Sequence, residues 1–299
     1  PPASLSGLVG SEMCIRDSDK AEGIVLKILK KNKFVENAKE GDEVEVITNQ
    51  TPFYGESGGQ VGDQGIISSS KCKINIQDTQ KKMGDLFVHY GTVQKGTFAV
   101  GDSVNLEINI QKRNNARANH SATHLLHEAL RRTLGKHVTQ KGSLVSPDRL
   151  RFDFSHNKPI EKDEVVKINK IVNEIVNGAS DVQTRIMSPK EAVNLGALAL
   201  FGEKYGDEVR VVFMGKEKNG FFSTELCGGT HVKNTKEVGE FKVISQSSIA
   251  SGIRRVEALR KKQLQDYEKS LKEDKNLKEK NLKDQVNFCL LYTSDAADE

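Results

Sequence analysis

The sequence predicts an α+β protein, in which a small antiparallel β-barrel is followed by an α+β unit with a zinc site and by a charged C-terminal helix. Three observations predict this architecture. Residues alternate with period two between Asp42 and Ile110, His120 and His124 lie one helical turn apart, and lysine and glutamate crowd residues 257–287. The length of 299 residues suggests about two domains, with ample chain for a buried core.

The composition is that of an ordinary soluble protein, with 36% hydrophobic and 29% charged residues. The formal net charge of +4 permits a polyanionic partner but favours one only weakly. Cys14, Cys72, Cys227 and Cys289 show no framework spacing, which favours a reduced, cytoplasmic compartment. No run approaches the roughly 20 apolar residues of a membrane span, and the N-terminus lacks the features of a signal peptide.

The first part of the chain is expected to form a short helix and then strands. From residue 20 to about 34, an amphipathic helix is favoured by Ile24, Leu26, Ile28 and Leu29 with their flanking lysines. Beyond it, alternating runs separated by Gly-Asp and Lys-Gly turns indicate antiparallel strands. These runs are residues 43–47, 72–76 and 104–108.

A helix around His120 and His124 is expected to carry its histidines away from its apolar stripe. The apolar residues from Ala118 to Ala129 fall on one side of a 3.6-residue wheel, and the histidines fall on the other. An HxxxH pair therefore presents two imidazoles on one face. His127, seven residues after His120, is expected to be an ordinary surface residue or a hydrogen-bonded core residue.

Cys227 and His231 supply a thiolate and a third imidazole, which together with His120 and His124 make a predicted set of four zinc ligands. Gly228, between Cys227 and His231, begins a Gly-Gly pair that predicts a loop. The fold must bring the two pairs together across about a hundred residues. Such a site is either closed and structural, or it leaves an open position where bound water becomes acidic, and the sequence leaves both alternatives open.

The later part of the chain mixes strands and helices. Ser188, Pro189 and Glu191 form a capping box with proline at the first helical position, which predicts a helix start. Arg151 and Asp153 are expected to form a structural pair. Strands are predicted at residues 150–154, 208–214 and 239–244, an apolar-periodic helix at 163–176, and a partly frayed, solvated helix at about 257–287.

Five motifs in this chain resemble the editing region of alanyl-tRNA synthetases, with a match that runs from about residue 20 to about 260. A glycine-rich motif, TPFYGESGGQVGDQG at residues 51–65, favours this family over the threonyl-tRNA synthetase editing domain and over free-standing alanyl-tRNA editing proteins, which share the two metal motifs. The five motifs are HSATHLLH at 120–127, QKGSLV at 140–145, RFDFSH at 151–156, LFGEKYGDEVRVV at 200–212 and STELCGGTH at 223–231.

The resemblance implies a division of the chain into parts. Residues 19–111 would form a translation-factor-like β-barrel, 112–257 an α+β editing domain with the zinc site, and 258–288 a charged helical linker. Residues 1–18 and 289–299 match nothing in the family, change composition abruptly, and are expected to be non-native adapter sequence. The class II aminoacylation module, with its ATP and Mg²⁺, is expected to lie outside this sequence.

The resemblance also implies a reaction, which is hydrolysis of the ester that joins a wrong serine or glycine to the acceptor end of tRNA(Ala). Thr123 is the candidate sensor of the serine hydroxyl and Gln140 a candidate catalytic residue, with the substrate pocket completed by Gly58, Gly59 and Gln60. Thr123 is about equally typical of an ordinary helix residue, and the glycines of tight turns. Arg131, Arg132, Lys136 and Lys141 are expected either to contact the tRNA acceptor end or to form a solvated face.

Three alternatives stay open. The chain would be a free-standing alanyl-tRNA editing protein, a tRNA-binding module in which zinc is purely structural, or a metallohydrolase with another substrate. The lack of HExxH, with Ser121 and Ala122 after the first histidine, argues against a zinc protease. If the chain is a segment of an alanyl-tRNA synthetase, the resemblance implies that the parent enzyme ligates alanine to tRNA(Ala) with ATP.

Overall fold

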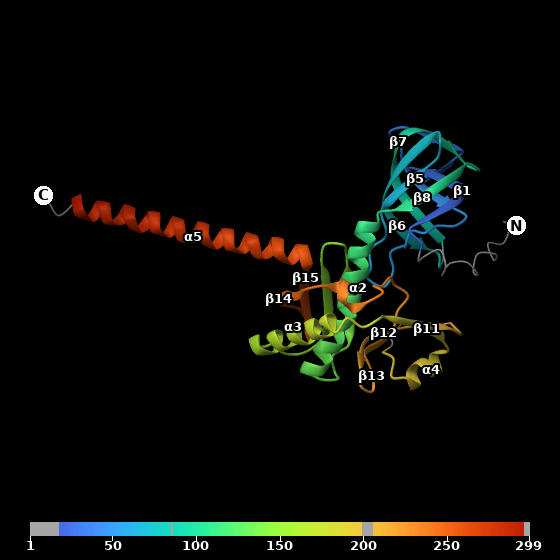
Figure 1. Cartoon of the computed structure of the whole chain (residues 1–299). Coiled ribbons are helices and arrows are strands. Elements are labelled where there is room, and N and C mark those ends of the chain that lie inside the picture. Colours follow the sequence, from blue (N-terminus) through green and yellow to red (C-terminus); the bar gives the residue numbers. More distant parts are fainter. Residues whose placement is uncertain (1–17, 85, 199–205, 296–299) are drawn as a thin grey trace.

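The computed structural model describes residues 18–84, 86–198 and 206–295. A β-barrel comes first, an α+β unit follows, and a long helix projects away from both (Figure 1). Of the segments expected to be non-native, residues 1–17 and 296–299 lie outside the described residues. Residues 289–295 continue the long helix.

The barrel is a closed antiparallel sheet of six strands in the order β1-β4-β7-β6-β5-β8, because β8 pairs back with β1. Alternate residues point inward, so that in β8 Val104, Leu106 and Ile108 are buried between exposed neighbours. The three predicted strands of this region are confirmed. The six strands are β1 (Lys20–Lys30), β4 (Glu43–Thr48), β5 (Gly65–Ser68), β6 (Cys72–Lys82), β7 (Leu86–Ala99) and β8 (Ser103–Ile108), and the short strands β2 (Lys33–Val35) and β3 (Asn37–Lys39) pair with β1 and β7.

The helix expected from residue 20 to about 34 is wrong, because this segment is strand β1. Its pairing with β4 shifts register between Val25 and Lys27, as at a β-bulge. The irregularity places the buried residues Val25 and Ile28 three positions apart. Three-residue spacing is also the spacing of a helix face, so the sequence pattern of an irregular strand imitates a helix.

Helix α2 (Ile110–Leu134) leads from the barrel into the α+β unit, which spans residues 109–260 (Figure 1). The Asn109 side chain accepts a hydrogen bond from the Lys112 N–H and caps its first turn, and Gly135, with φ of 120°, follows its end. The apolar face of α2 shares one core with α3 (Lys162–Asn177) and a four-stranded sheet. In spatial order the sheet contains β14 (Phe241–Ala250), β15 (Ile253–Arg260), β10 (Leu150–Ser155) and β9 (Gln140–Val145).

A second, three-stranded sheet contributes side chains to the same core as α2 and carries the short helix α4 (Pro189–Asn194). The predicted capping box is present, since Ser188 and Glu191 exchange hydrogen bonds at the start of α4. The predicted strands and helices of this half are confirmed. The sheet contains β11 (Gln183–Met187), β12 (Val209–Glu217) and β13 (Gly220–Leu226), and the 3-10 helix η1 (Thr235–Val238) precedes β14.

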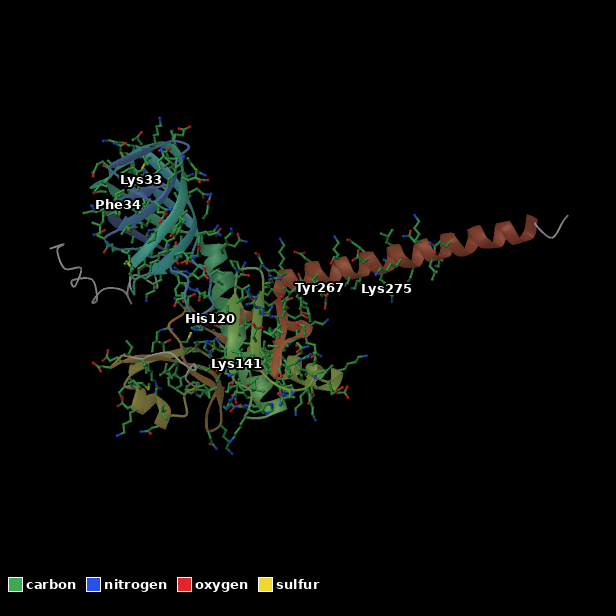
Figure 2. The ribbon with its side chains drawn as sticks, turned by 180° about the vertical axis from the view of Figure 1, so that it is seen from behind. Lys33, Phe34, His120, Lys141, Tyr267 and Lys275 are labelled. Atoms are coloured by element: carbon green, nitrogen blue, oxygen red, sulfur yellow. The ribbon has the colours of Figure 1, made fainter. Side chains whose placement is uncertain are left out.

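Helix α5 (Lys261–Asp295) forms the projecting arm. It begins four residues later than predicted, because Glu257 belongs to β15 and pairs with Arg151 of β10. Leu264 is buried against the unit, whereas Leu271 and Leu277 are exposed, and Figure 2 shows Lys275 on the free part of the arm. Among the described residues no helix is both long and apolar enough to cross a membrane.

A buried ion pair joins the barrel to α2. The Arg113 side chain is fully buried, and its Nε donates to Asp63 Oδ2 at 2.7 Å while its Nη2 donates to Pro52 O at 2.7 Å. The same Asp63 oxygen accepts the Tyr54 N–H. Because removing one partner would leave a buried charge unpaired, this contact fixes the glycine-rich loop of the barrel against α2.

The buried His89 side chain should make the stability of the barrel depend on pH. Its ring is fully buried, with Nδ1 2.9 Å from Val46 O and Nε2 2.7 Å from Thr51 Oγ1, and burial lowers its pKa to about 4. The unfolded chain, with a histidine pKa near 6.5, binds this proton first on acidification. The free energy of unfolding therefore falls as the pH falls from about 6.5 to about 4, in total by on the order of 3 kcal/mol.

Urea unfolding of the whole chain at pH 7 and pH 5 checks this expectation. Between pH 7 and pH 5, the free energy of unfolding of His89→Gln should fall by about 2 kcal/mol less than that of the unsubstituted chain. His137→Gln, at an exposed histidine, is the control and should lose as much as the unsubstituted chain. Equal losses in all three proteins would contradict the assignment.

Candidate metal centre

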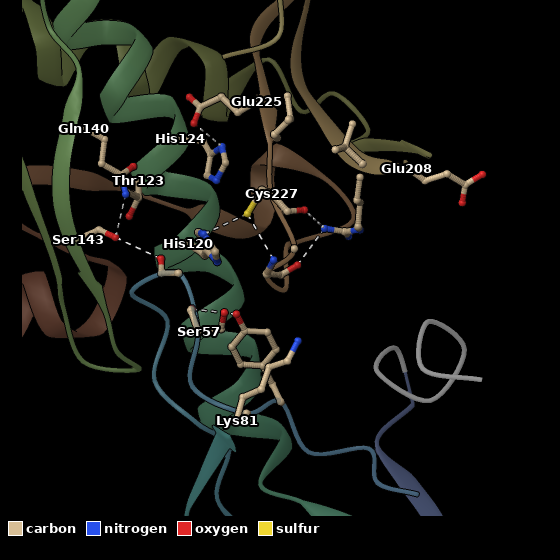
Figure 3. Close-up of a pocket in the computed structure, with 18 of the residues that line it drawn as sticks. Ser57, Lys81, His120, Thr123, His124, Gln140, Ser143, Glu208, Glu225 and Cys227 are labelled. Carbon is tan, nitrogen blue, oxygen red and sulfur yellow. Dashed lines mark hydrogen bonds and ion pairs between the residues drawn. The ribbon is translucent and has the colours of Figure 1, made fainter. Parts of the chain in front are cut away.

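Two distant segments bring four potential metal ligands together. Helix α2 contributes His120 and His124, and the loop after β13 contributes Cys227 and His231. One nitrogen or sulfur atom from each residue lies within 4.8 Å of the others. The predicted meeting of the HxxxH and CxxxH pairs is therefore present in the fold, and Figure 3 shows three of the four residues, His120, His124 and Cys227.

The two distances from the Cys227 sulfur to imidazole nitrogens of this cluster are close to those around a tetrahedral ion. Cys227 Sγ lies 3.4 Å from His120 Nε2 and 3.2 Å from His231 Nε2. Ligands around tetrahedral zinc stand about 3.3 to 3.8 Å apart, given zinc-nitrogen and zinc-sulfur bonds of about 2.0 to 2.3 Å. One thiolate and three imidazoles are also a donor set that suits zinc. The cluster could thus hold such a metal with little rearrangement.

The loop that carries Cys227 is shaped by Arg210 and by glycine. The Arg210 guanidinium donates to the carbonyl oxygens of Cys227 at 2.8 Å and of Gly229 at 3.0 Å. A Cβ at Gly229 would lie 2.5 Å from His120 Nδ1, so any side chain here would push the imidazole away. The predicted Gly-Gly loop is confirmed, and close approach to the His120 ring is a reason for its second glycine.

Each imidazole of the cluster has an oxygen atom beside its Nδ1, which leaves its Nε2 for a metal. Such outer contacts orient metal-binding histidines and select the tautomer. The pairs are His120 with Gln60 Oε1 at 2.7 Å, His124 with Glu225 Oε2 at 3.0 Å, and His231 with Ser121 Oγ at 3.2 Å.

Glu225 brings a buried negative charge to the back of the site. Burial alone raises the pKa of its carboxyl, but His124 and His127 hold that pKa well below its usual range. In turn, burial lowers the pKa of His124, while the Glu225 and Cys227 charges raise it to about 10. His127 Nδ1 lies 3.2 Å from Glu225 Oε1, which confirms His127 as a buried, hydrogen-bonded core residue.

The thiol of Cys227 is held in the form that binds metals. Burial raises its pKa, yet the imidazoles of His120, His231 and His124 hold that pKa well below its usual range. Burial lowers the pKa of His231 to about 3, with Cys227 opposing that shift, so this imidazole is neutral. A thiolate beside a neutral imidazole is the state that a metal ligand set requires.

A cavity of about 290 Å³ opens beside the cluster and is lined by both the barrel and the α+β unit (Figure 3). Of the predicted pocket and catalytic residues, Gly58, Thr123 and Gln140 line it. Gln60 is fully buried behind the wall, and Gly59 packs against β9. The structure thus separates the glycine-rich motif into one part that faces the cavity and another that supports the metal cluster.

Several lining residues were not predicted. Glu225 could have been found, because it lies two positions before Cys227 at the end of a strand, where period two puts both on one face. Lys81 and Phe87, from β6 and β7, belong to the cavity only because the barrel docks here. Tyr54 and Ser57 complete the barrel wall, with the Tyr54 hydroxyl donating to Ser57 O at 3.0 Å.

The four basic residues expected either to contact tRNA or to form a solvated face divide into two groups. Arg131 donates to Val138 O at 2.9 Å, and Arg132 pairs with Glu217 and lies 4.2 Å from the centre of the Phe222 ring, so both stabilise the fold. Lys136 and Lys141 are exposed.

Arg151 and Asp153, expected to form a structural pair, are 3.8 Å apart. The closer partner of Asp153 is Arg255 on the neighbouring strand, at 2.7 and 2.8 Å. Asp153 is therefore tied mainly to β15, and Arg151 is its second, more distant cation.

Comparison with known proteins places these features in a family. Residues 6–112 match the family described as tRNA synthetases class II (A), and residues 209–257 match the threonyl and alanyl tRNA synthetase second additional domain. The second match includes Cys227 and His231. The first begins inside the segment 1–18 that composition had set apart.

Curated relatives agree with these family matches. The chain is 56% identical over 248 residues to an alanine-tRNA ligase of Chelativorans sp., covering 81% of this chain and 28% of that protein. It is 53% identical over 265 residues to the one from Mesorhizobium japonicum, covering 86% and 30%, and 53% identical over 249 residues to the one from Rhodopseudomonas palustris, covering 81% and 28%. The chain therefore spans less than a third of the length of these relatives.

Glu225→Gln should lower the affinity of the whole chain for Zn²⁺ at least tenfold, because it removes the negative charge that lies 3.0 Å from His124 Nδ1 behind the ligand set. Competition with a chromophoric chelator at pH 7.5 measures this affinity. Glu208→Gln is the matched control, since Glu208 lines the same cavity but is exposed. Equal affinities in the two variants would show that Glu225 does not support the cluster.

Proposed function

Because the chain belongs to the alanyl-tRNA synthetase family, as a segment of it, we propose that it carries the editing activity of such an enzyme. The reaction is hydrolysis of the ester that joins serine or glycine to the 3′ end of tRNA(Ala). Water adds to the ester carbonyl, the bond to the ribose oxygen breaks, and that oxygen takes up a proton. Free amino acid and uncharged tRNA leave.

The observation that carries the proposal is the cavity beside the His120, His124, Cys227 and His231 cluster. Potential metal ligands line this cavity together with neutral hydrogen-bonding side chains such as Thr123 and Gln140, and charged and apolar side chains complete its wall. A bound zinc ion would supply positive charge at the end of the cavity where the ester carbonyl is placed. The neutral side chains would select and orient the amino acid.

Thr123 is placed to recognise a serine hydroxyl. Its own hydroxyl donates to Asn119 O at 2.8 Å, one helical turn back, so its oxygen is left as an acceptor. Serine can donate to that oxygen and alanine cannot. A buried acceptor left without its donor costs about 1 to 3 kcal/mol, which is the physical basis for sparing correctly charged alanine.

Gln140 lines the cavity from β9. Its amide nitrogen donates a long hydrogen bond to Ser143 Oγ at 3.3 Å, which orients the side chain. The remaining amide atoms are placed to hold either the amino acid or the attacking water. In this proposal Gln140 orients reactants and does not exchange protons with them.

The rest of the parent protein completes this function. Ligation of alanine to tRNA(Ala), with its need for ATP and Mg²⁺, would belong to parts of the relatives that this sequence does not cover. The exposed Lys136 and Lys141 remain candidates for contact with the tRNA acceptor end. A cytoplasmic location goes with this role.

One observation favours a second candidate function. Four protein ligands already satisfy a tetrahedral zinc ion, and closed sites of that kind are usually structural. The chain would then be a tRNA-binding module that never cleaves the ester.

Metal removal distinguishes the two candidates. Hydrolysis of serine-charged tRNA(Ala) by the chain should fall at least a hundredfold after chelation and in Cys227→Ala, with unchanged far-UV circular dichroism, because the cavity loses its positive charge. Cys72→Ala, at a buried cysteine of β6 in the barrel, should keep full activity. If the intact chain binds tRNA(Ala) without deacylating it, the binding module is the correct function.

Thr123→Val should lower hydrolysis of serine-charged tRNA(Ala) about 10- to 100-fold, because valine keeps the shape but removes the acceptor oxygen. The rate on alanine-charged tRNA(Ala) should not fall, so discrimination is lost. Thr133→Val on the same helix is the control. Unchanged discrimination in Thr123→Val would leave Thr123 as an ordinary helix residue.

A further inference from the structure

Gln60 reaches the metal cluster from the other domain. It lies in the glycine-rich loop between β4 and β5 of the barrel, yet its side chain is fully buried against the α+β unit. Its Oε1 is 2.7 Å from His120 Nδ1 and accepts the Thr230 N–H at 3.0 Å. Its Nε2 donates to Thr230 Oγ1 at 2.8 Å.

These contacts fix the tautomer of His120. The Thr230 backbone N–H can only donate, so the amide atom that it meets must be the oxygen of Gln60. That oxygen can only accept, so His120 Nδ1 must carry its proton. His120 Nε2 is then left with a free lone pair, 3.4 Å from Cys227 Sγ, and both atoms could bind one metal ion.

The position of Gln60 is set by how the glycine-rich loop docks. The loop forms two backbone hydrogen bonds with β9, from Val61 N to Val145 O at 3.1 Å and from Val145 N to Gly59 O at 2.7 Å. A Cβ at Gly59, where φ is +85°, would lie 2.7 Å from Ser143 O, so the loop touches β9 only because this residue is glycine.

We propose that Gln60 is a positioning residue through which the barrel controls metal retention. Docking of the glycine-rich loop holds His120 in its ligand tautomer, and the bound metal in turn strengthens docking, because such coupling is reciprocal. The inference rests on the metal centre of the proposed function and adds its regulation by the neighbouring domain. When the barrel undocks, the four ligands would hold the metal less tightly.

The test uses the whole chain and Zn²⁺ alone. Gln60→Leu keeps the volume and removes both polar atoms, and its zinc affinity should fall about 10- to 100-fold in competition with a chromophoric chelator. Gln60→Glu restores an acceptor oxygen for His120 and should bind at least ten times more tightly than Gln60→Leu. Gln77→Leu, at an exposed glutamine of β6, should bind like the unsubstituted chain.

A pair of glycines tests docking without touching Gln60. Gly59→Ala should weaken zinc binding at least tenfold because it separates the loop from β9. Gly58→Ala has the same class of backbone conformation, φ of +58°, but nothing within 4 Å of its Cβ, and should weaken it less than threefold. Circular dichroism and thermal unfolding of the metal-free variants check that each one folds.

The results separate this inference from the proposed function. Zinc affinity in Gln60→Leu within twofold of the unsubstituted chain would overturn the inference, even if the chain deacylates tRNA(Ala). The other outcome is that the unsubstituted chain binds zinc, Gln60→Leu binds it weakly, Gln60→Glu binds it more tightly again, and the unsubstituted chain deacylates nothing. That outcome would support the inference and reject the editing function.

Discussion

The pairing of two acidic groups, the buried Glu225 carboxylate and the half-buried Cys227 thiol, is the constraint on which the rest of the site depends. A charge removed from water is costly unless it is paired and hydrogen-bonded. Imidazoles from α2 lie beside both groups, and His231, from the loop after β13, lies beside Cys227. The fold must therefore hold α2 against that loop, and the core shared by α2, α3 and the four-stranded sheet does so.

Helix α2 meets this demand by being buried on two opposite sides. Its apolar residues share a core with the four-stranded sheet, and His120 and His124 line the cavity, so most of its central part is buried. At its start, Arg113 binds the barrel. One helix thus sets the distance between the barrel loop, the metal ligands and the cavity.

Much of this arrangement was predictable from the chain itself. Alternation of buried residues identified the strands, capping residues identified α4, and the spacing of His120, His124, Cys227 and His231 identified the cluster that the fold assembles. The error at β1 has a physical cause, since an irregular pairing gives a strand the spacing of a helix. The contacts of Gln60 with His120 and Thr230 span 60 and 170 residues. They depend on how the barrel docks on the α+β unit, which no local pattern encodes.

The barrel and the α+β unit both line the cavity, so evolution can move this region between proteins only in certain pieces. A boundary drawn near residue 111 separates two hydrophobic cores cleanly. Yet a cut at this boundary would separate Gln60 from His120, and would separate Gly58 from Thr123, which lines the same cavity. The portable module, for gene fusion in evolution or for grafting by an engineer, is therefore the barrel and the α+β unit together, although each has its own core.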